Sequence, residues 1–271
     1  MFKINNLTYQ YDKTRKALDN VSMDFNKGNI IGIIGSNGSG KSTLFNNLMG
    51  ILKSTEGEIL YNGEQIKYDK KSLYNLRKEV GIVFQDPEKQ IFYSMVYDDI
   101  AFALRNIGID EKTIKERIHT ALEAVNGLQF IDRPVHNLSF GQKKRVAIAS
   151  VVAMENKLVL LDEPTAGLDP ISTRAIVDII KGLNDRGVKI IISSHDMNLI
   201  YEICDYVYVL NQGVLINEGT REEVFINEEK IDEAGLELPW LVKLHKNMGL
   251  PLFTREEDLY SYWNHREQKT V

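Results

Sequence analysis

Apolar and polar positions alternate along residues 1–34, and the segment ends in the continuous apolar run NIIGII. Alternation with a period of two is typical of half-buried strands, and a short apolar run is typical of a fully buried strand. Two more short strands are predicted at GEILYNG and VGIVFQ. Residues 95–126 are predicted to be helical, because apolar side chains recur there at helix-face spacing: Ile114, Ile118, Ala121, Leu122 and Val125.

After residue 137 helices and strands alternate. A helix from Gln142 is followed by the strand KLVLLDEP, a helix over 171–184, the strand VKIIISS, a short helix and a hairpin around Asn211–Gly213. This order predicts an α/β fold with a mostly parallel sheet, beside which the N-terminal strands form an antiparallel piece. We expect 86–137 to be a helical insertion, and the chain after about residue 225 to be a charged tail with one apolar segment, LPWLVKLHKNMGLP.

Composition narrows the class of protein. The chain has 271 residues, 43% of them hydrophobic, and a net charge of −5, which disfavours a broad nucleic-acid-binding surface. The single cysteine, Cys204, forms no internal disulfide and is expected to be a buried packing residue in a reducing compartment. No apolar run reaches the roughly 20 residues that span a bilayer, and the start lacks a signal-peptide core, so we expect an intracellular chain that does not itself cross a membrane.

A phosphate-binding loop follows the apolar run at 30–34. IIGIIGSNGSGKSTLF matches G-x4-G-K-[ST] at Gly35, Gly40, Lys41 and Ser42, between a predicted strand and a predicted helix. Glycines let backbone N–H groups surround phosphate oxygens, and the helix N-terminus adds positive charge. Lys41 is expected on the β- and γ-phosphates and the Ser42 hydroxyl on Mg²⁺. The predicted nucleotide contacts are Gly35, Ser36, Asn37, Gly38, Ser39, Gly40, Lys41, Ser42 and Thr43.

Two acids follow the apolar run in KLVLLDEPTAGLDP. Asp162 and Glu163 stand at the C-terminal end of a predicted buried strand, which is where ligands bind in parallel sheets. Asp162 is predicted to hold Mg²⁺ through water, and Glu163 to polarise the attacking water as general base. Two solvated turn residues are the alternative, and the phosphate loop elsewhere in the chain favours catalysis.

Taken together, the phosphate loop, VFQDPEKQIF, LSFGQ, LLDEPTAGLDP and IISSHD resemble the ATP-binding-cassette (ABC) ATPases over roughly residues 1–225. The resemblance implies that Tyr11 stacks on adenine, with Tyr9 as the competitor. It implies that Gln85 touches Mg²⁺ or the attacking water and senses a membrane partner. It also implies that Asp169 lies at a dimer seam and that His195 contacts the γ-phosphate. Catalysis is thereby assigned to Glu163, His195, Lys41 and Gln85, and Mg²⁺ binding to Ser42, Gln85 and Asp162.

LSFGQ resembles the family signature, with Phe140 where a small residue is usual. The resemblance implies that Ser139, Gly141 and Gln142 cap the γ-phosphate of ATP held by another subunit, so that two ATP molecules lie in a head-to-tail dimer. A single cassette implies a homodimer or a pair with a sister ATPase. Phe140 is expected to pack away from the nucleotide and steady the turn.

Within the family, GIVFQDPEKQIFYSMVYDDIAFAL and LSFGQKKRVAIASVVAM look like the ATPases of energy-coupling-factor importers of the cobalt (CbiO) type. That resemblance implies a P-loop NTPase core over 1–225, a helical subdomain at about 86–150, and an extension over 226–271 that could contact a dimer partner. It also implies docking on an integral membrane coupling subunit, with a separate membrane subunit capturing cargo, at the cytoplasmic face of the cell membrane. The aromatic cluster Phe92, Tyr93 and Tyr97 is a predicted docking groove, with core packing as the alternative.

The same motifs leave other interpretations open. The cargo could be cobalt, nickel or a vitamin, and the family likeness favours cobalt. A soluble ABC ATPase outside transport is the alternative from a different class, although neither a long coiled coil nor a second cassette is present.

Overall fold

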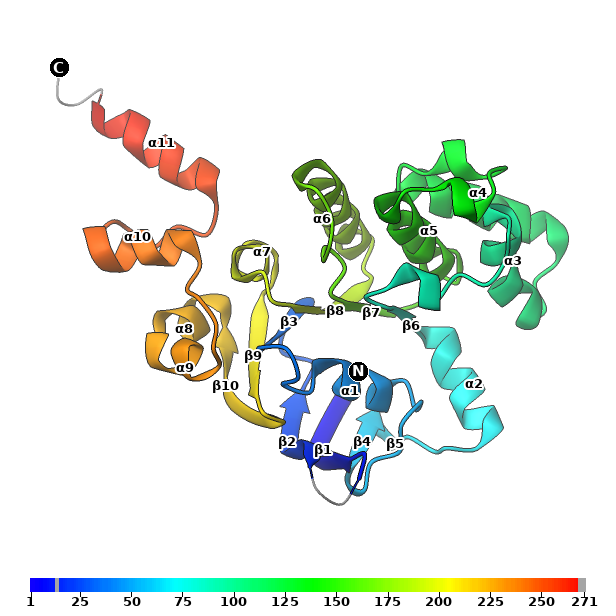
Figure 1. The fold of residues 1–271 in the computed structure, drawn as a ribbon, viewed down its shortest axis with the longest axis horizontal. Helices are drawn as coiled ribbons and strands as arrows, with labels where there is room; N and C mark the ends of the chain where they lie inside the picture. Colours follow the sequence, from blue (N-terminus) through cyan, green and yellow to red (C-terminus); the bar gives the residue numbers. More distant parts are fainter. Residues whose placement is uncertain (13–14, 268–271) are drawn as a thin grey trace.

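The computed structural model describes residues 1–12 and 15–267, and it is built around two β-sheets (Figure 1). The larger, six-stranded sheet has the order β10-β9-β3-β8-β7-β6, and the smaller one the order β2-β1-β4-β5. In the larger sheet the five strands β9, β3, β8, β7 and β6 run parallel, while β10 pairs antiparallel at one edge. The strands are β1 (Phe2–Gln10), β2 (Lys16–Asp24), β3 (Ile30–Ile34), β4 (Glu56–Tyr61), β5 (Glu64–Gln65), β6 (Val80–Val83), β7 (Leu158–Asp162), β8 (Lys189–Ser194), β9 (Tyr206–Asn211) and β10 (Val214–Thr220).

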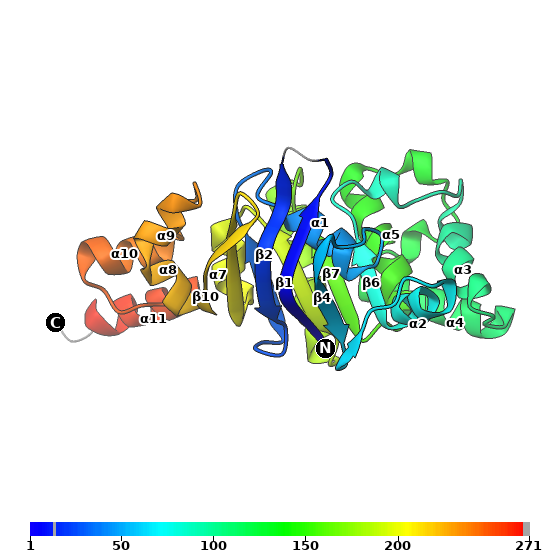
Figure 2. The same ribbon diagram turned by 90° about the horizontal axis from the view of Figure 1, so that it is seen from below.

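Helices connect the parallel strands and form both ends of the molecule. The α-helices are α1 (Lys41–Leu48), α2 (Lys70–Glu79), α3 (Val96–Asn106), α4 (Glu111–Ala124), α5 (Phe140–Ala153), α6 (Pro170–Asp185), α7 (Met197–Ile203), α8 (Arg221–Ile226), α9 (Glu228–Glu233), α10 (Trp240–Met248) and α11 (Glu256–Glu267). Short 3₁₀ turns are η1 (Pro87–Lys89), η2 (Leu128–Phe130) and η3 (Val135–Asn137). In both ribbon views α3, α4 and α5 lie at one end of the large sheet and α8 to α11 at the other (Figures 1 and 2). The predicted α/β fold, with an antiparallel sheet and a helical region beside it, is therefore confirmed.

The central strands are buried on both faces because each divides its side chains between two cores. On β8, Ile190 and Ile192 face one hydrophobic cluster and Ile191 faces the other. The first cluster is covered by α5, α6 and α7, and the second by α1 and the antiparallel sheet. A fully buried strand needs an unbroken apolar run, which is the pattern that the chain shows at 30–34 and 158–161.

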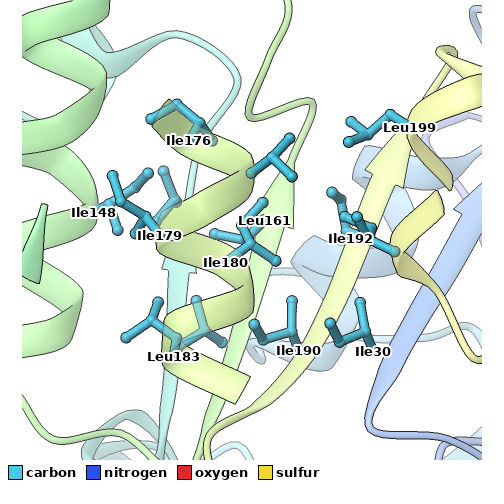
Figure 3. Packing of buried hydrophobic residues seen from close by; sticks show 14 of the residues in the cluster. Ile30, Ile148, Leu161, Ile176, Ile179, Ile180, Leu183, Ile190, Ile192 and Leu199 are labelled. Atoms are coloured by element: carbon cyan, nitrogen blue, oxygen red, sulfur yellow. The ribbon is translucent and has the colours of Figure 1, made fainter. Parts of the chain in front are cut away.

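Helix α6 covers the middle of the first cluster. Ile176, Ile179, Ile180 and Leu183 are spaced three or four residues apart, so they lie on one face of the helix. Ile180 lies beside Leu161 of β7, and Ile179 lies beside Ile148 of α5 (Figure 3). This packing holds in place the strand that ends in Asp162. The rigid support of the site therefore comes from the sheet and from α6.

Three helical segments differ from the sequence prediction in their limits. The helical stretch expected over 95–126 is two helices, because Gly108 adopts a left-handed φ of 80° and Asp110 caps a new helix, α4. The helix expected from Gln142 begins at Phe140, since Ser139 is its N-cap in a reciprocal capping box. Helix α2 was not predicted, and Leu76 is the one buried residue among its ten.

In the described residues up to 267, the tail expected after about residue 225 is helical and contains α9, α10 and α11, while α8 crosses the predicted boundary at 225/226. Residues of α8, α9 and α10, including Phe225, Ile231 and Val242, are buried in the first cluster. Cys204 is fully buried there too, as predicted. Across residues 1–12 and 15–267, every helix falls short of the length and apolar character needed to span a bilayer.

Candidate functional site

The phosphate loop lies at the carboxyl end of β3, in the middle of the large sheet. Gly35 and Gly40 have φ values of 155° and 109°, in the region that favours glycine. A Cβ at Gly35 would come within 2.2 Å of the Leu210 carbonyl oxygen, and one at Gly40 within 2.6 Å of the Ala17 carbonyl oxygen. Both glycines are therefore required by close backbone packing, which fixes the loop against β9 and β2.

Lys41 is the first residue of α1, and its side chain folds back over the loop. Its Nζ donates to the carbonyl oxygens of Gly35 at 2.7 Å and Ser36 at 3.1 Å. Burial lowers the pKa of Lys41, and the negative charges of Glu163 and Asp162 partly oppose this shift. In the described chain the Ser39 hydroxyl is buried beneath the loop without a hydrogen-bond partner. Loop and lysine thus form a compact cationic cradle that an anion suits.

The end of β7 places two acids beside this cradle. Asp162 and Glu163 are each 5% exposed. The Ser193 hydroxyl donates to Asp162 Oδ1 at 2.5 Å, and it accepts the Glu163 N–H at 3.0 Å. Ser193 lies on β8, directly across from Asp162 in the parallel register. One hydroxyl on the neighbouring strand therefore holds both acidic residues in place.

The Glu163 carboxylate lies between two cationic or potentially cationic groups. Its Oε2 is 2.7 Å from Nδ1 of His195, and its Oε1 is 3.9 Å from Nζ of Lys41. The His195 side chain is 59% exposed, whereas that of Glu163 is 7% exposed. The arrangement joins a buried carboxylate to an imidazole that faces solvent, a geometry suited to moving a proton or orienting a water molecule.

A cleft of about 420 Å³ opens in front of these residues. Tyr11 stands at its rim, 64% exposed, with its hydroxyl 3.2 Å from the Thr43 hydroxyl oxygen. Tyr9 packs edge-on against Tyr11, with ring centroids 5.0 Å apart, and does not line the cleft. Tyr11 therefore offers a free aromatic face and Tyr9 supports it. The cleft is lined by Tyr11, Asp12, Arg15, Ala17, Asn37, Gly38, Gly40, Lys41, Ser42, Thr43, Gln85 and Glu163.

Ser42 and Gln85 are exposed to this cleft, and Asp162 lies behind it at the end of β7. A hydroxyl, an amide and a carboxylate supply the hard oxygen donors that Mg²⁺ takes together with water and phosphate. In residues 1–12 and 15–267 no group of three or more His, Cys, Asp or Glu side chains could hold a metal by itself. The donor set therefore fits a magnesium ion that arrives with nucleotide, and it does not fit a metal held by the protein alone.

The predicted signature turn lies outside this cleft. Ser139 caps α5, its hydroxyl accepting the Gln142 N–H while the Gln142 side chain accepts the Ser139 N–H. A Cβ at Gly141 would lie 3.2 Å from the Ser172 hydroxyl, and Asp169 caps α6 through Ser172. Since none of these side chains lines the cleft, the turn has no access to phosphate bound by its own loop.

Phe140 does not line the cleft and packs on its own subunit. Its ring is 40% exposed, and its Cε1 lies 3.5 Å from the position that a Cβ at Gly167 would take. The ring therefore rests on the glycine of the AGLD segment between β7 and α6.

The three aromatic residues predicted as a docking groove divide into two groups. Phe92 is 78% exposed and Tyr93 is 44% exposed, whereas Tyr97 is partly buried against the first core cluster. Phe102 of α3 joins Tyr93, with ring centroids 5.3 Å apart, and is 41% exposed. The buried Asp99 carboxylate accepts the N–H groups of Phe92 and Tyr93 and so holds the loop. We name Phe92, Tyr93 and Phe102 the aromatic patch.

Sequence reasoning missed three residues at the site. Arg15 lines the cleft beside Tyr11, where the basic stretch KTRK was the available signal. Ser193 was passed over as part of a strand, although a hydroxyl in an apolar strand was a signal in itself. Lys144 is completely buried in α5 and donates to the Glu163 carbonyl oxygen at 2.9 Å. Lys144 stands between Lys143 and Arg145, so its sequence context carries no signal that it is buried.

Comparison with known proteins places this geometry in a family. The ABC transporter family model matches residues 18–166. The chain is 46% identical over 269 residues to the cobalt import ATP-binding protein CbiO of Salmonella typhimurium, covering 99% of this chain and 97% of the relative. It is 43% identical over 248 residues to the energy-coupling factor transporter ATP-binding protein EcfA of Methanosphaera stadtmanae, covering 92% and 89%.

A solved structure gives the same result. The chain superposes on CbiO1 from Clostridium perfringens, part of the ABC transporter complex CbiONQ, with a TM-score of 0.77 and 41% identity, covering 90% of this chain and 98% of that one. These likenesses extend over nearly the whole length of the chain. The chain therefore belongs to the ABC transporter family, as an ATPase whose hydrolysis of ATP is coupled to transport.

Proposed function

We propose that the chain is the ATP-hydrolysing subunit of an energy-coupling-factor importer, and that Glu163 is its general base. The observation that carries this role is the position of the Glu163 carboxylate, 2.7 Å from His195 Nδ1 and 3.9 Å from Lys41 Nζ on the wall of the cleft. A water molecule between Glu163 and the γ-phosphate would lose its proton to the carboxylate as it attacks phosphorus. His195, exposed beside it, would hold the γ-phosphate oxygens.

Binding of ATP would use groups that the loop now satisfies internally. Lys41 Nζ would exchange the carbonyl oxygens of Gly35 and Ser36 for β- and γ-phosphate oxygens. N–H groups of the loop, from Gly35 to Thr43, would surround the phosphates, and Tyr11 would stack on adenine. Burial now opposes the ammonium form of Lys41, and the negative charge of bound phosphate would favour it.

Ser42, Gln85 and Asp162 would hold Mg²⁺ with the nucleotide. When bound, the ion supplies positive charge that neutralises the phosphate oxygens. The Ser42 hydroxyl and the Gln85 amide would ligate it from the cleft, while Asp162 would act through water. Ser193 fixes the Asp162 oxygen on the side away from solvent and so sets the direction of the remaining lone pairs.

The cleft is expected to be completed by a second subunit. Ser139, Gly141, Gln142 and Asp169 lie outside their own cleft, and Ser139 and Gly141 stand at the N-terminus of a 14-residue helix. In a head-to-tail pair each turn would cap ATP bound to the other subunit, with the helix dipole facing the γ-phosphate. The pair would be a homodimer or a heterodimer with a sister ATPase, and the extension over 226–271 would add dimer contacts.

The aromatic patch is the surface proposed to meet the membrane subunits. Exposed rings supported by a buried carboxylate form a stable apolar surface, which suits the docking of a helix from an integral membrane coupling subunit. The chain would then act as a peripheral protein at the cytoplasmic face of the cell membrane. Similarity to a cobalt import protein at 46% identity supports cobalt ion as the cargo, captured by a separate membrane subunit.

Replacement of Glu163 by glutamine tests the catalytic proposal. Glu163→Gln is expected to lower the rate of ATP hydrolysis by about 10²–10⁴-fold, as the loss of a general base does, while ATP binding and ATP-driven dimerisation persist. Glu123→Gln, an exposed change on α4, serves as the matched control and should hydrolyse at the parental rate. Hydrolysis by Glu163→Gln within about tenfold of the parent would refute the role.

Reconstitution tests the cargo and the partners. Co-expression with the membrane proteins encoded beside this chain, followed by affinity purification, should recover a complex that takes up radioactive cobalt ion with ATP. Phe92→Ser together with Tyr93→Ser should abolish recovery of the complex and leave ATP binding intact. ATP-dependent uptake of nickel or a vitamin, without cobalt, would replace the cargo assignment and leave the catalytic one standing.

A further inference from the structure

Lys144 is a lysine whose side chain the fold removes from solvent. It lies one helical turn beyond the start of α5 and is completely buried. Its Nζ donates to the backbone carbonyl oxygen of Glu163 at 2.9 Å, nineteen residues further along the chain. It also lies 6.0 Å from the centre of the Phe140 ring, which packs on Gly167. Lys144 therefore lies between Phe140 of the signature turn and the backbone of Glu163, the residue proposed as the base.

The surroundings of Lys144 oppose its charge. Burial lowers the pKa of Lys144 to about 8, although the negative charges of Asp162, Glu163 and Asp86 act in the other direction. A buried charge is weak support for folding, since an apolar side chain of similar volume often serves as well or better. A role beyond stability is therefore the better explanation for an ammonium group at this point.

The backbone of Glu163 adopts an unusual conformation, which hydrogen bonds from neighbouring elements must stabilise. Its φ of 47° lies in the left-handed region, which is unfavourable for a residue with a side chain. Its N–H donates to the hydroxyl and the carbonyl oxygen of Ser193, at 3.0 Å and 3.2 Å. Its own carbonyl oxygen accepts from the Lys144 ammonium at 2.9 Å and from the Ala166 N–H at 3.2 Å. The N–H of this residue is thus held from β8, and its carbonyl group is held from α5 and from the turn that follows β7.

We propose that Lys144 is a positioning residue that ties the signature helix to Glu163 and keeps the Glu163 carboxylate aimed at the attacking water. The inference rests on the role proposed for Glu163. Helix α5 starts at the turn that would meet ATP bound to the second subunit, so a shift of that turn moves Lys144 with it. Through Lys144, the alignment of Glu163 in one subunit depends on the signature turn of that same subunit. That turn contacts the ATP bound to the other subunit.

The first test compares two neighbouring lysines. Lys144→Met should lower kcat by about 10–100-fold, the range expected when a catalytic group is misplaced by about 1 Å, and leave the Kd for ATP within about threefold. Lys143→Met is the matched control, since Lys143 pairs with Glu88 near the surface and should show parental kcat. Lys144→Arg keeps a donor for the carbonyl and should recover at least about tenfold of the loss.

The second test separates positioning from a general structural effect. In a Glu163→Gln background, Lys144→Met should lower the single-turnover rate by less than about twofold further, because residues that act as one unit are not additive. A purely structural role would give the same loss in both backgrounds. If Lys144→Met fails to fold, Lys144→Gln takes its place, since its amide is one atom too short to reach the carbonyl oxygen and the same loss of kcat is expected.

The outcomes distinguish the two proposals. A Glu163→Gln variant with near-parental activity overturns the proposed base, and the role of Lys144 falls with it. An inactive Glu163→Gln variant beside a Lys144→Met variant of parental kcat overturns the role of Lys144 alone. Equal losses from Lys144→Met in both backgrounds, or no recovery in Lys144→Arg, also overturn it.

Discussion

The Ser193 hydroxyl offers a direct measure of how firmly the two acids are held. Ser193→Ala removes a fully buried group that donates to Asp162 Oδ1 at 2.5 Å and accepts the Glu163 N–H at 3.0 Å. The Glu163 N–H keeps a second acceptor, the Ser193 carbonyl oxygen at 3.2 Å, so its loss is small. The main loss is the bond to the Asp162 carboxylate.

A hydrogen bond to a charged group contributes about 1.5–3 kcal/mol, so Ser193→Ala should lower the free energy of unfolding by about 2–3 kcal/mol. It should also lower kcat by roughly tenfold, because the carboxylates proposed to act on Mg²⁺ and water both lose part of their alignment. Urea unfolding followed by circular dichroism gives the first quantity, and a steady-state ATPase assay gives the second.

Ser194→Ala is the matched control for this measurement. The Ser194 hydroxyl is equally buried but accepts an uncharged N–H, that of Asp196, at 3.0 Å. Its removal should cost about 1 kcal/mol and leave kcat near the parental value. If Ser193→Ala destabilises the protein no more than Ser194→Ala does, the bond to Asp162 carries no charge-assisted contribution and the reasoning is wrong.

Three further changes test separate parts of the site. Tyr11→Leu should raise the Kd for ATP roughly tenfold with little change in kcat, since stacking of a base on an aromatic ring contributes about 1–3 kcal/mol. Tyr11→Phe keeps the ring and should bind ATP normally. Fluorescence titration with a labelled nucleotide measures the Kd of both variants. Gly40→Ala should abolish detectable ATP binding, because its Cβ would lie 2.6 Å from a carbonyl oxygen. Gly38→Ala has space around its Cβ, so it should lose only about 1–2 kcal/mol of folding stability, which comes from its positive φ. Phe140→Gly should keep the ATPase rate within about threefold of the parent. It should lower the free energy of unfolding by about 1 kcal/mol, as expected for glycine in a helix. A large loss of hydrolysis would show that the ring does more than pack.

The parts of the site that could be predicted from sequence are those whose geometry is local. A buried strand followed by a glycine turn and a helix must bring Gly35, Gly40 and Lys41 together, because few residues separate them. The end of β7 is equally local, and a parallel sheet must bring the carboxyl ends of β3, β7 and β8 to one edge. Lys41, Glu163 and His195 could thus be expected close together from the sequence alone.

Helix limits were harder to predict because single residues at turns and N-caps decided them. Gly108 and Asp110 divide the expected helix over 95–126, and both lie within an otherwise periodic apolar pattern. Helix α2 was missed because it lacks a periodic apolar pattern. Among its residues only Leu76 is buried, so a capping aspartate at Asp69 was the main signal of its start.

Lys143 and Lys144 show where prediction from sequence ends. After residue 145 helix α5 is apolar on almost every side, with Val146, Ala147, Ile148 and Ala149 buried in succession. Such a helix has no single polar face, so periodicity cannot tell which of two adjacent lysines points inward. Lys144 is the lysine that points inward, because its Nζ donates to the Glu163 carbonyl oxygen. That oxygen lies near α5 only when the helical region is packed on the sheet. Two residues that are chemically identical in the sequence thus come to differ through tertiary packing, and the paired variants at 143 and 144 measure that difference.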